Sequence, residues 1–406
     1  MKLNFQKQNK KIKNIHLLNN ADENEVRART GYVRRRRNPA RLLLIRLSVV
    51  AAVLLVLFLL WKNWEKIAPE SVLDWAQVQF GNVEPGNGYP YEVAGNSVLG
   101  MGQVDTYLTV LTDDALTFLD GDATKLVQRP NTLTEPTLKI AGDYVLVTEL
   151  GGSRFHLETR RETVYQMELP NRRIYASDVS KNGFVAVVTD PDSQNYICGV
   201  QVYDSRKNQL FQYKSNKYHI VNVALSVDGR SLAAVGTTAE DGKLKSVVLV
   251  FDLDEDTPTE YVGYDQLLYG VKYFNNTVLV VGDEEYWSIT TDNGTVNKTA
   301  YNGMEVIGYA ASQTTVGLVV RQSGSAASGE VWLFDSTGKR MTTHSFNGTY
   351  RFAACQESSF VILTDQTVYV WNEESKTVEA PSDSLMVCEY NDTVMILTLN
   401  DLQQVK

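Results

Sequence analysis

Cysteine and histidine are scarce in this chain, and neither occurs in the close pairs that zinc sites use. Its 406 residues include three cysteines and four histidines. These residues are widely spaced: Cys198, Cys355, Cys388, His16, His156, His219 and His344. Because zinc sites need cysteine or histidine ligands at short, paired spacing, the sequence predicts no metal site. We expect each histidine to be a packed or surface residue.

The motifs of common enzyme classes are also missing. The chain has no G-x-S-x-G elbow, no G-x-G-x-x-G loop and no Walker sequence. The turn DLDEDT opens like a calcium loop, but Thr257 stands at the position of the turn glycine and Gly263 at that of the bidentate glutamate. We therefore expect a solvated turn there, and no catalytic constellation, no cofactor and no enzymatic activity in the chain.

Positive charge is concentrated at the N-terminal end. Residues 1–46 hold thirteen of the 39 lysine and arginine residues but three of the 48 acidic residues, so the rest of the chain is strongly acidic. Because nucleic-acid binding depends on a cationic surface, we exclude nucleic acid as a partner of the main domain.

One long apolar run occurs, at residues 42–61, and Arg46 is its only charged residue. Twenty residues at about 1.5 Å each span the roughly 30 Å core of a bilayer. We predict a transmembrane helix rather than a buried core helix, which would keep a polar face. A cleaved signal peptide is the competing interpretation, but no small-x-small cleavage site follows the run.

Arginine asymmetry predicts the orientation. Arg34 to Arg37, Arg41 and Arg46 precede or open the run, whereas Lys62 and Lys66 after it are balanced by acidic residues. The positive-inside rule then places the N-terminus in the cytoplasm. We expect a disordered basic tail at 1–41, the membrane helix at 42–61, a juxtamembrane helix and linker at 62–88, and an extracytoplasmic domain at 89–406.

The main domain repeats a short strand pattern. Five-residue strands with similar sequences end at regular intervals of 37 to 48 residues, at Asp120, Glu158, Asp204, Asp252, Thr290, Asp335 and Asn372. A period near forty residues with four strand-like runs is typical of a β-propeller blade. Helical periodicity is absent, so we predict an all-β propeller.

Eight pairs of inner strands can be counted, and the last copy is too short for a fourth strand. We predict an eight-bladed ring that is closed by YPYEV at residues 89–93, with a seven-bladed ring as the alternative. Pro90 has no N–H to donate and fits an outermost edge strand.

The segments GYPYEVAGNSV and LKIAGDYVLVTELGGSRFHLETRRETVYQ and the recurrent VYDS and LFDSTGK turns carry a resemblance. They are similar to an uncharacterised bacterial family of membrane-anchored proteins with a quinoprotein-like or WD40-like propeller. The similarity covers roughly residues 65–330 and is most specific from Gly151 to Tyr165. The resemblance implies the propeller fold and a location in the bacterial cell envelope, and it implies no catalytic residues.

We look for binding residues in the loops that join one blade to the next. In propellers, binding sites usually lie on the face that carries these loops or at the mouth of the central channel. We expect the blade-linking loops to carry Arg129, Arg172, Arg173, Lys214, Lys217, Tyr218, Tyr264 and Tyr350. We expect the loops between second and third strands to carry Asp113, Asp114, Asp192, Glu240, Asp241, Asp283, Glu284 and Glu285. Such a ring of charge and tyrosine suits a polar protein or glycan partner, although solvated loop tips would look the same.

These observations predict a membrane-anchored, extracytoplasmic propeller that acts as a protein-interaction or scaffold module of the cell envelope. A sensor that binds a glycan or small molecule is the alternative. A quinoprotein-like enzyme is a weaker third reading, since the tryptophan repeats and adjacent cysteine pair of that class are missing.

The pairing of Cys355 and Cys388 stays open at this point. Both residues fall on matching first strands of neighbouring repeats. An oxidising exterior permits a disulfide there, but we favour two packed free thiols, because cysteine is a good small apolar residue in a core.

Overall fold

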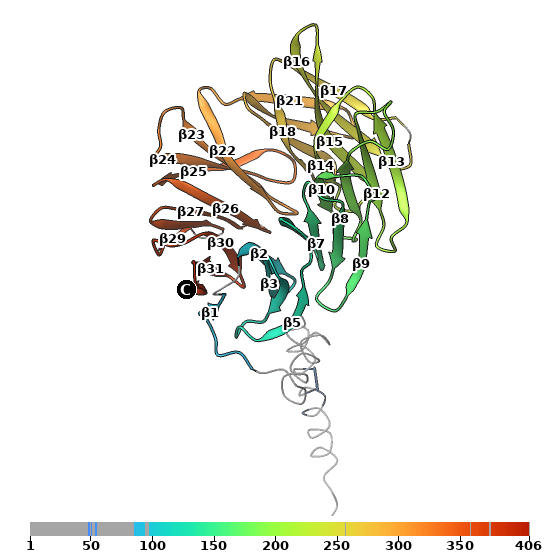
Figure 1. Ribbon diagram of the computed structural model, residues 1–406. Helices are drawn as coiled ribbons and strands as arrows, with labels where there is room; N and C mark the ends of the chain where they lie inside the picture. The colour runs from blue at the N-terminus through green and yellow to red at the C-terminus, as the bar shows by residue number, and fades with distance from the viewer. Residues whose placement is uncertain are drawn as a thin grey trace, which may run out of the picture. The chain divides into compact units, whose positions relative to one another are not determined.

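Strands are the main regular structure of the described residues. The computed structural model describes Ser48, Val50, Val53 and Leu54 and residues 85–93, 97–255, 257–357, 359–372 and 375–405. Within these residues, strands β1 to β32 form eight antiparallel four-stranded sheets. The sheets are arranged as blades around a centre, with the first strand of each blade innermost (Figure 1).

Blades 1 to 7 are each four consecutive strands, and blade 8 combines the two ends of the domain. Blades 1 and 2 contain β2 (Val98–Val104), β3 (Tyr107–Thr112), β4 (Ala115–Leu119), β5 (Lys125–Pro130), β6 (Pro136–Ala141), β7 (Tyr144–Glu149), β8 (Arg154–Glu158) and β9 (Thr163–Glu168). Blades 3 and 4 contain β10 (Ile174–Val179), β11 (Val185–Thr189), β12 (Cys198–Tyr203), β13 (Gln209–Ser215), β14 (His219–Leu225), β15 (Ser231–Glu240), β16 (Lys243–Asp252) and β17 (Thr259–Tyr264). Blades 5 and 6 contain β18 (Leu268–Tyr273), β19 (Thr277–Gly282), β20 (Glu285–Thr290), β21 (Thr295–Ala300), β22 (Met304–Ala311), β23 (Val316–Gln322), β24 (Ser328–Phe334) and β25 (Arg340–Asn347). Blades 7 and 8 contain β26 (Tyr350–Gln356), β27 (Ser359–Thr364), β28 (Thr367–Trp371), β29 (Ser375–Glu379), β30 (Met386–Tyr390), β31 (Thr393–Leu397), β32 (Asp401–Val405) and β1 (Tyr91–Glu92).

The core lies between blades, because each sheet packs on both faces. The second strand of blade 5, β19, is buried at every position, whereas the outermost strand, β21, is largely exposed. Glycines admit large side chains from the next blade. A Cβ on Gly317 of β23 would lie 2.2 Å from the ring of Phe360 in β27. Close backbone approach at such positions requires the missing side chain.

The ring is closed by β1, which confirms the eight-bladed prediction and rejects the seven-bladed one. Tyr91 and Glu92 pair with Leu402 and Asp401 of β32, and the N–H of Val93 donates to the carbonyl of Asn400 at 3.0 Å. Blade 8 also contacts blade 1 directly, since the Tyr390 hydroxyl donates to the Thr106 carbonyl at 3.0 Å. The closing strand is shorter than expected and begins after Pro90, which has no N–H for a ladder.

The membrane and tail predictions fall mainly outside the described residues. Segments 1–41 and 62–84, and most of 42–61, are not described; Ser48, Val50, Val53 and Leu54 are helical. Among the described residues, no helix has the length and hydropathy needed to cross a bilayer. The membrane helix and the orientation therefore stay predictions.

Candidate interaction surface

Two kinds of loop share one side of the ring, because successive strands of a blade run in opposite directions. Loops that join one blade to the next, and loops between second and third strands, form what we call the linking face. Loops between first and second strands, and between third and fourth strands, form the opposite turn face. The predicted binding residues lie at or near the linking face, and the structure brings most of them together on blades 3 and 4.

The linking face of blade 3 carries two paired basic residues. Arg173 lies between β9 and β10 and binds Asp190 at 2.9 Å from Nε to Oδ2, while the hydroxyl of Tyr175 donates to the same carboxylate. Lys214, at the end of β13, pairs with Asp192 at 2.7 Å. Hydrogen bonds from these cations lower the pKa of both carboxyl groups, so both pairs are charged at neutral pH.

Blade 4 extends this surface with a long hairpin. Strands β15 and β16 have ten residues each, more than any other strand, and the hairpin projects at the top of Figure 1. Near its tip, Lys245 pairs with Glu240 at 2.6 Å and its ammonium lies over the ring of Tyr264, 5.6 Å from the centroid. Lys243 binds Asp265 at 3.5 Å.

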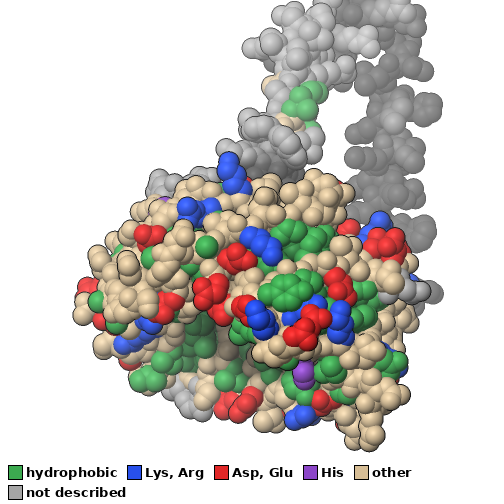
Figure 2. Space-filling model, turned by 90° about the horizontal axis from the view of Figure 1, so that it is seen from above, with side chains coloured by type: hydrophobic (Ala, Val, Ile, Leu, Met, Phe, Trp, Pro, Cys, Tyr) green, Lys and Arg blue, Asp and Glu red, His purple; other side chains and the backbone are tan. Residues whose placement is uncertain are grey.

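Apolar side chains lie among these charges. Tyr264 is 57% exposed, Tyr175 42% and Leu244 40%. Seen from above, this side of the molecule shows hydrophobic side chains bordered by basic and acidic ones (Figure 2). The set that we call the blade 3–4 patch comprises Arg172, Arg173, Tyr175, Asp190, Asp192, Lys214, Lys217, Glu240, Lys243, Leu244, Lys245, Glu260, Tyr264 and Asp265.

Lys217 joins the two halves of the patch. It follows β13, yet its ammonium lies 3.7 Å from Glu260 of β17 in the next blade, and 4.7 Å from the centroid of the Tyr218 ring. Its charge also lowers the pKa of Glu240, after the larger effect of Lys245. Arg172 contributes at the other end, where its charge helps to lower the pKa of Asp192.

Three predicted residues are not available as free binding groups. Arg129 lies within β5 instead of a loop, and donates to the carbonyls of Thr159 and Arg160 in the neighbouring blade at 2.8 and 2.7 Å. Tyr218 is 1% exposed. Tyr350 opens β26 and packs in the blade 6–7 core, where burial raises its pKa to about 12. Tyr218 does lie in the predicted link, between β13 and β14, whereas Arg129 is within β5 and Tyr350 is the first residue of β26.

Several predicted acids hold their own loops together. The carboxylates of Asp113 and Asp283 accept backbone N–H groups of Ser97 and Leu267 at 3.2 and 2.9 Å. Glu285 lies in β20, where it accepts the indole N–H of Trp287 at 2.7 Å. Asp192 and Glu240 alone among the predicted acids form ion pairs within the patch. Capping of loops therefore explains much of the acidic pattern on this face.

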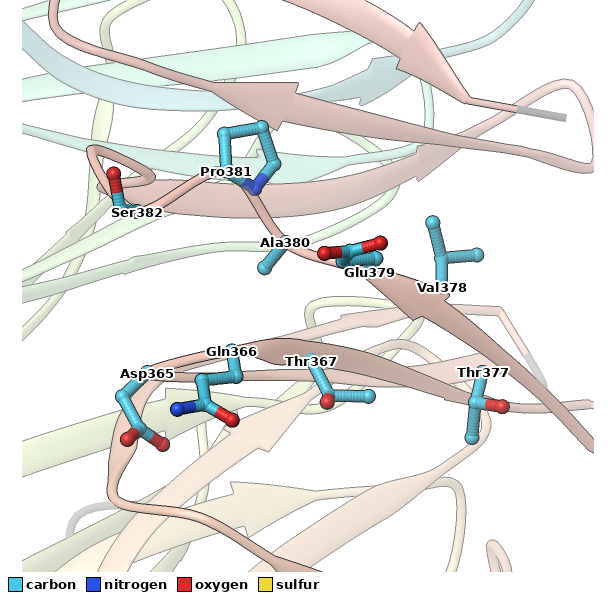
Figure 3. A pocket seen from close by; sticks show the side chains of 9 residues that line it. All are labelled: Asp365, Gln366, Thr367, Thr377, Val378, Glu379, Ala380, Pro381 and Ser382. Atoms are coloured by element: carbon cyan, nitrogen blue, oxygen red, sulfur yellow. The ribbon is translucent and has the colours of Figure 1, made fainter.

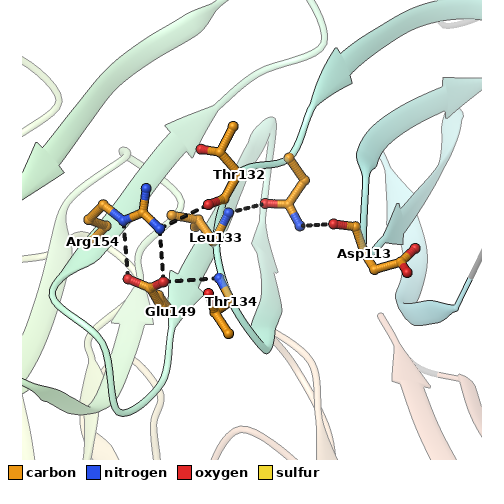
Figure 4. A network of polar contacts seen from close by, with 7 residues as sticks. Asp113, Thr132, Leu133, Thr134, Glu149 and Arg154 are labelled. Carbon is orange, nitrogen blue, oxygen red and sulfur yellow. Dashed lines mark hydrogen bonds and ion pairs between the residues drawn. The ribbon is translucent and has the colours of Figure 1, made fainter.

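A network between blades 1 and 2 was not predicted from the sequence (Figure 4). The Glu149 carboxylate accepts from Arg154 Nε at 3.2 Å, from its terminal nitrogen at 2.9 Å, and from the N–H of Thr134 at 2.9 Å. The guanidinium also donates to the Thr132 carbonyl at 2.8 Å. These contacts lower the pKa of Glu149 to about 2, the Arg154 hydrogen bonds being the largest cause. The network ties the link between the blades to β7 and β8.

Two pockets among the described residues lie away from the patch. The larger pocket, about 610 Å³, lies at the outer edge of blade 7, between the start of β28 and the end of β29 (Figure 3). Its Asp365 carboxylate accepts the Thr349 N–H at 2.8 Å, so it is occupied in holding the loop. The smaller pocket, about 320 Å³, lies on the turn face of blades 3 to 5.

The ligand chemistry of the described residues is limited. They contain no cluster of three or more potential metal ligands. Within the described chain Cys198, Cys355 and Cys388 are free thiols, and burial raises the pKa of Cys355 and of Cys388 to about 12. The structure therefore has no disulfide between Cys355 and Cys388.

The acidic turn after β16 is a hydrogen-bonded turn, in which the Asp252 carboxylate accepts the Asp254 N–H at 3.0 Å.

Eight four-stranded blades closed by one strand from the N-terminal side of the domain define this protein as a β-propeller. The chain belongs to a family of unknown function, DUF5711, whose model matches residues 82–406. The predicted resemblance to an uncharacterised propeller family is thereby confirmed, and the match extends beyond residue 330 through the last two blades.

Two solved structures are similar to the chain at low identity. The C-terminal WD40 domain of Sif2 is similar with 11% identity and a TM-score of 0.52, over 74% of this chain and 93% of that one. BamB from Moraxella catarrhalis is similar with 12% identity and a TM-score of 0.46, over 75% of this chain and 96% of that one. No curated protein sequence matches the chain. At such identities the likeness concerns the fold alone.

Proposed function

We propose that this protein is a membrane-anchored, extracytoplasmic scaffold of the bacterial cell envelope that binds a protein partner through the blade 3–4 patch. The observation that carries this proposal is the projecting β15–β16 hairpin. Its exposed Leu244 stands between Lys243 and Lys245, and both lysines form ion pairs. The exposed Tyr264 ends the neighbouring strand β17, and the Lys245 ammonium lies over its ring. Interface centres are rich in exposed aromatic side chains, whereas interface rims are polar and hydrated.

The shape of the surface favours a protein over a small ligand. Small molecules bind in concave pockets that bury most of their surface, whereas two pockets of the described residues, of about 610 and 320 Å³, lie away from the patch. All basic groups of the patch except Arg172 form ion pairs with carboxylates, so a partner meets largely neutralised charges around an apolar centre.

The envelope location rests on the sequence. The apolar run at 42–61 and the arginines before it support a single membrane helix with the propeller outside. The sequence has none of the motifs of serine hydrolases or nucleotide-binding enzymes, which favours a binding role over an enzymatic one.

Site-specific photo-cross-linking in producing cells tests this proposal. With p-benzoylphenylalanine in place of Tyr264 or Leu244, both positions should cross-link to the same envelope protein. Met341, which is 50% exposed in β25 of blade 6, is the matched control position. Tyr264→Ala should weaken the purified complex about 30-fold, as for an aromatic hot spot, and Met341→Ala should leave it unchanged. Equal cross-linking from Met341, or none from either patch position, contradicts the proposal.

A further inference from the structure

Three neighbouring innermost strands, β10, β14 and β18, are irregular near their first residues. The register of each strand against the second strand of its blade shifts there, which is a β-bulge. The residues left without a partner across the sheet are Tyr175, Val221 and Tyr269. Because a link from the preceding blade leads into each of these strands, all three bulges lie at the linking face, around the centre of the ring (Figure 1).

The bulges bring apolar side chains to the surface. Val221 is 39% exposed and Tyr175 is also exposed, whereas the isoleucines directly before them, Ile220 and Ile174, are buried. Tyr269 is half-buried. A bulge bends its strand and redirects the side chain of the extra residue, so these apolar side chains face water although they belong to inner strands.

Two exposed leucines in loops of the linking face continue this row. Leu150 follows β7 and forms an isolated parallel bridge with Ile174, beside Tyr175. Leu267 lies in the link that leads into β18, just before the bulge of that strand. The row, which we call the inner rim, runs over blades 2 to 5 and comprises Leu150, Tyr175, Val221, Leu267 and Tyr269. Tyr175 belongs both to the inner rim and to the blade 3–4 patch.

Polar groups beside the inner rim are already engaged within the protein. The Glu149 carboxylate pairs with Arg154 at 2.9 Å, and the Asp283 carboxylate accepts the Leu267 N–H at 2.9 Å. The Tyr175 hydroxyl donates to a carboxylate of the patch. A polar surface placed here would lose its bound water and gain few hydrogen bonds, which is unfavourable. An apolar surface would instead gain about 25 cal/mol for each Å² that it buries.

A stable interface requires more surface than the patch supplies. Specific protein–protein interfaces bury about 800 Å² on each partner, from roughly 20–30 residues, and the blade 3–4 patch has fewer residues than that. Leu150 and Leu267 of the inner rim adjoin the patch residues Tyr175 and Asp265. The other large exposed hydrophobic residues of the described propeller outside the patch and the inner rim lie on outer strands or on blade 8, across the ring from blade 4: Leu210, Met341, Leu385 and Leu399. Exposed apolar surface therefore extends from the patch toward the centre of the ring.

We propose that the partner of the blade 3–4 patch also covers the inner rim, and that it does so with an apolar segment of aliphatic and aromatic side chains. This inference rests on the proposed function and specifies the chemistry of the partner at the same surface. The segment crosses the linking ends of blades 2 to 5. The inner rim then enlarges the apolar centre of the interface, and the ion pairs of the patch form its polar border, as is usual in protein interfaces.

Photo-cross-linking tests the inner rim separately from the patch. With p-benzoylphenylalanine in place of Leu150 or Val221, the full-length protein in producing cells should cross-link to the same envelope protein as it does from the Tyr264 position. Leu399, which is 63% exposed on the linking face of blade 8, is the matched control and should not cross-link to that protein. In the purified complex, Leu150→Asp and Val221→Asp should each weaken binding at least about tenfold, and Leu399→Asp should leave it unchanged.

Thermal melting shows that the aspartate variants are folded. Both should melt near the wild-type temperature, because they replace exposed side chains. Leu150 lies in a loop, so Leu150→Asp still reports on binding if Val221→Asp distorts β14.

The outcomes separate this inference from the proposed function. Cross-links from Tyr264 and Leu244 without any from Leu150 and Val221 would overturn the inference and leave the proposed function in place. Capture of a second copy of this chain, or of lipid, from the inner rim would overturn it in favour of self-association or of a membrane surface. Equal capture of the partner from Leu399 would overturn it as well, because the partner would not favour blades 2 to 5. Absence of cross-links from every position would overturn both proposals.

Discussion

Replacing Glu149 with glutamine tests how strongly one buried carboxylate holds blades 1 and 2 together. Glu149 is 7% exposed and accepts hydrogen bonds from Arg154 and from the Thr134 N–H. Its pKa is lowered from 4.5 to about 2. That difference corresponds to at most about 3 kcal/mol of stability at neutral pH. The Arg154 side chain is 36% exposed, so solvent screening reduces the expected loss in Glu149→Gln to about 1–2 kcal/mol.

The contribution of Glu149 to the free energy of unfolding changes with pH in a definite direction. Because the folded-state pKa of Glu149 is depressed, its contribution is complete above about pH 4.5 and is lost as the pH falls toward 2. Urea unfolding of wild type and Glu149→Gln should therefore differ most above pH 5 and converge in acid. Hydrogen exchange should show faster exchange at the Thr134 amide in the variant. Glu379→Gln on exposed β29 is the matched control.

Gly152→Ala reaches the same network by a different route. A Cβ at this position would lie 2.3 Å from the carboxyl carbon of Glu149, so the carboxylate must move away from Arg154. The two substitutions should be strongly non-additive, since each removes the same interaction. Additive losses, or equal stability of Glu149→Gln and wild type between pH 5 and 8, would refute this account of the network.

Three further predictions concern packing, closure and topology. Gly317→Ala should lower the free energy of unfolding by about 1–3 kcal/mol in urea titrations, because its Cβ would overlap the Phe360 ring; wild-type stability would show that the core yields there. Deleting residues 89–93 should speed hydrogen exchange in residues 385–399, since β32 loses its partner; unchanged exchange in a folded variant would contradict closure by β1. Protease added to intact cells should release a fragment that starts after about residue 65 and leave the tail protected; a cut tail with a protected propeller would reverse the orientation.

The surroundings of some candidate residues could be predicted from the sequence and those of others could not. The difference depends on whether the contacting residues belong to the same blade or to the next one. Lys214 and Asp192 are 22 positions apart in sequence but belong to one blade, so their proximity follows from the hairpin pattern. Tyr218 resembles an exposed loop tyrosine in sequence, yet the outer strand of the next blade covers it and Glu260 accepts its hydroxyl at 3.0 Å. Burial by a neighbouring blade depends on the angle between sheets, which no local pattern encodes.

The amino-acid sequence by itself determined the blade repeat, and it favoured eight blades over seven with a closing strand at residues 89–93. Alternating strands and turn residues are local signals, and a final repeat that lacks a strand points to a partner strand at the other end of the domain. The tertiary structure alone decided which charges meet. Lys139 and Asp178 come from blades 2 and 3, and Lys217 from the link after blade 3 pairs with Glu260 of blade 4. These pairs form because the ring places neighbouring sheets side by side. Electrostatic interactions depend on distance in space, which the sequence separation of residues on different blades does not set.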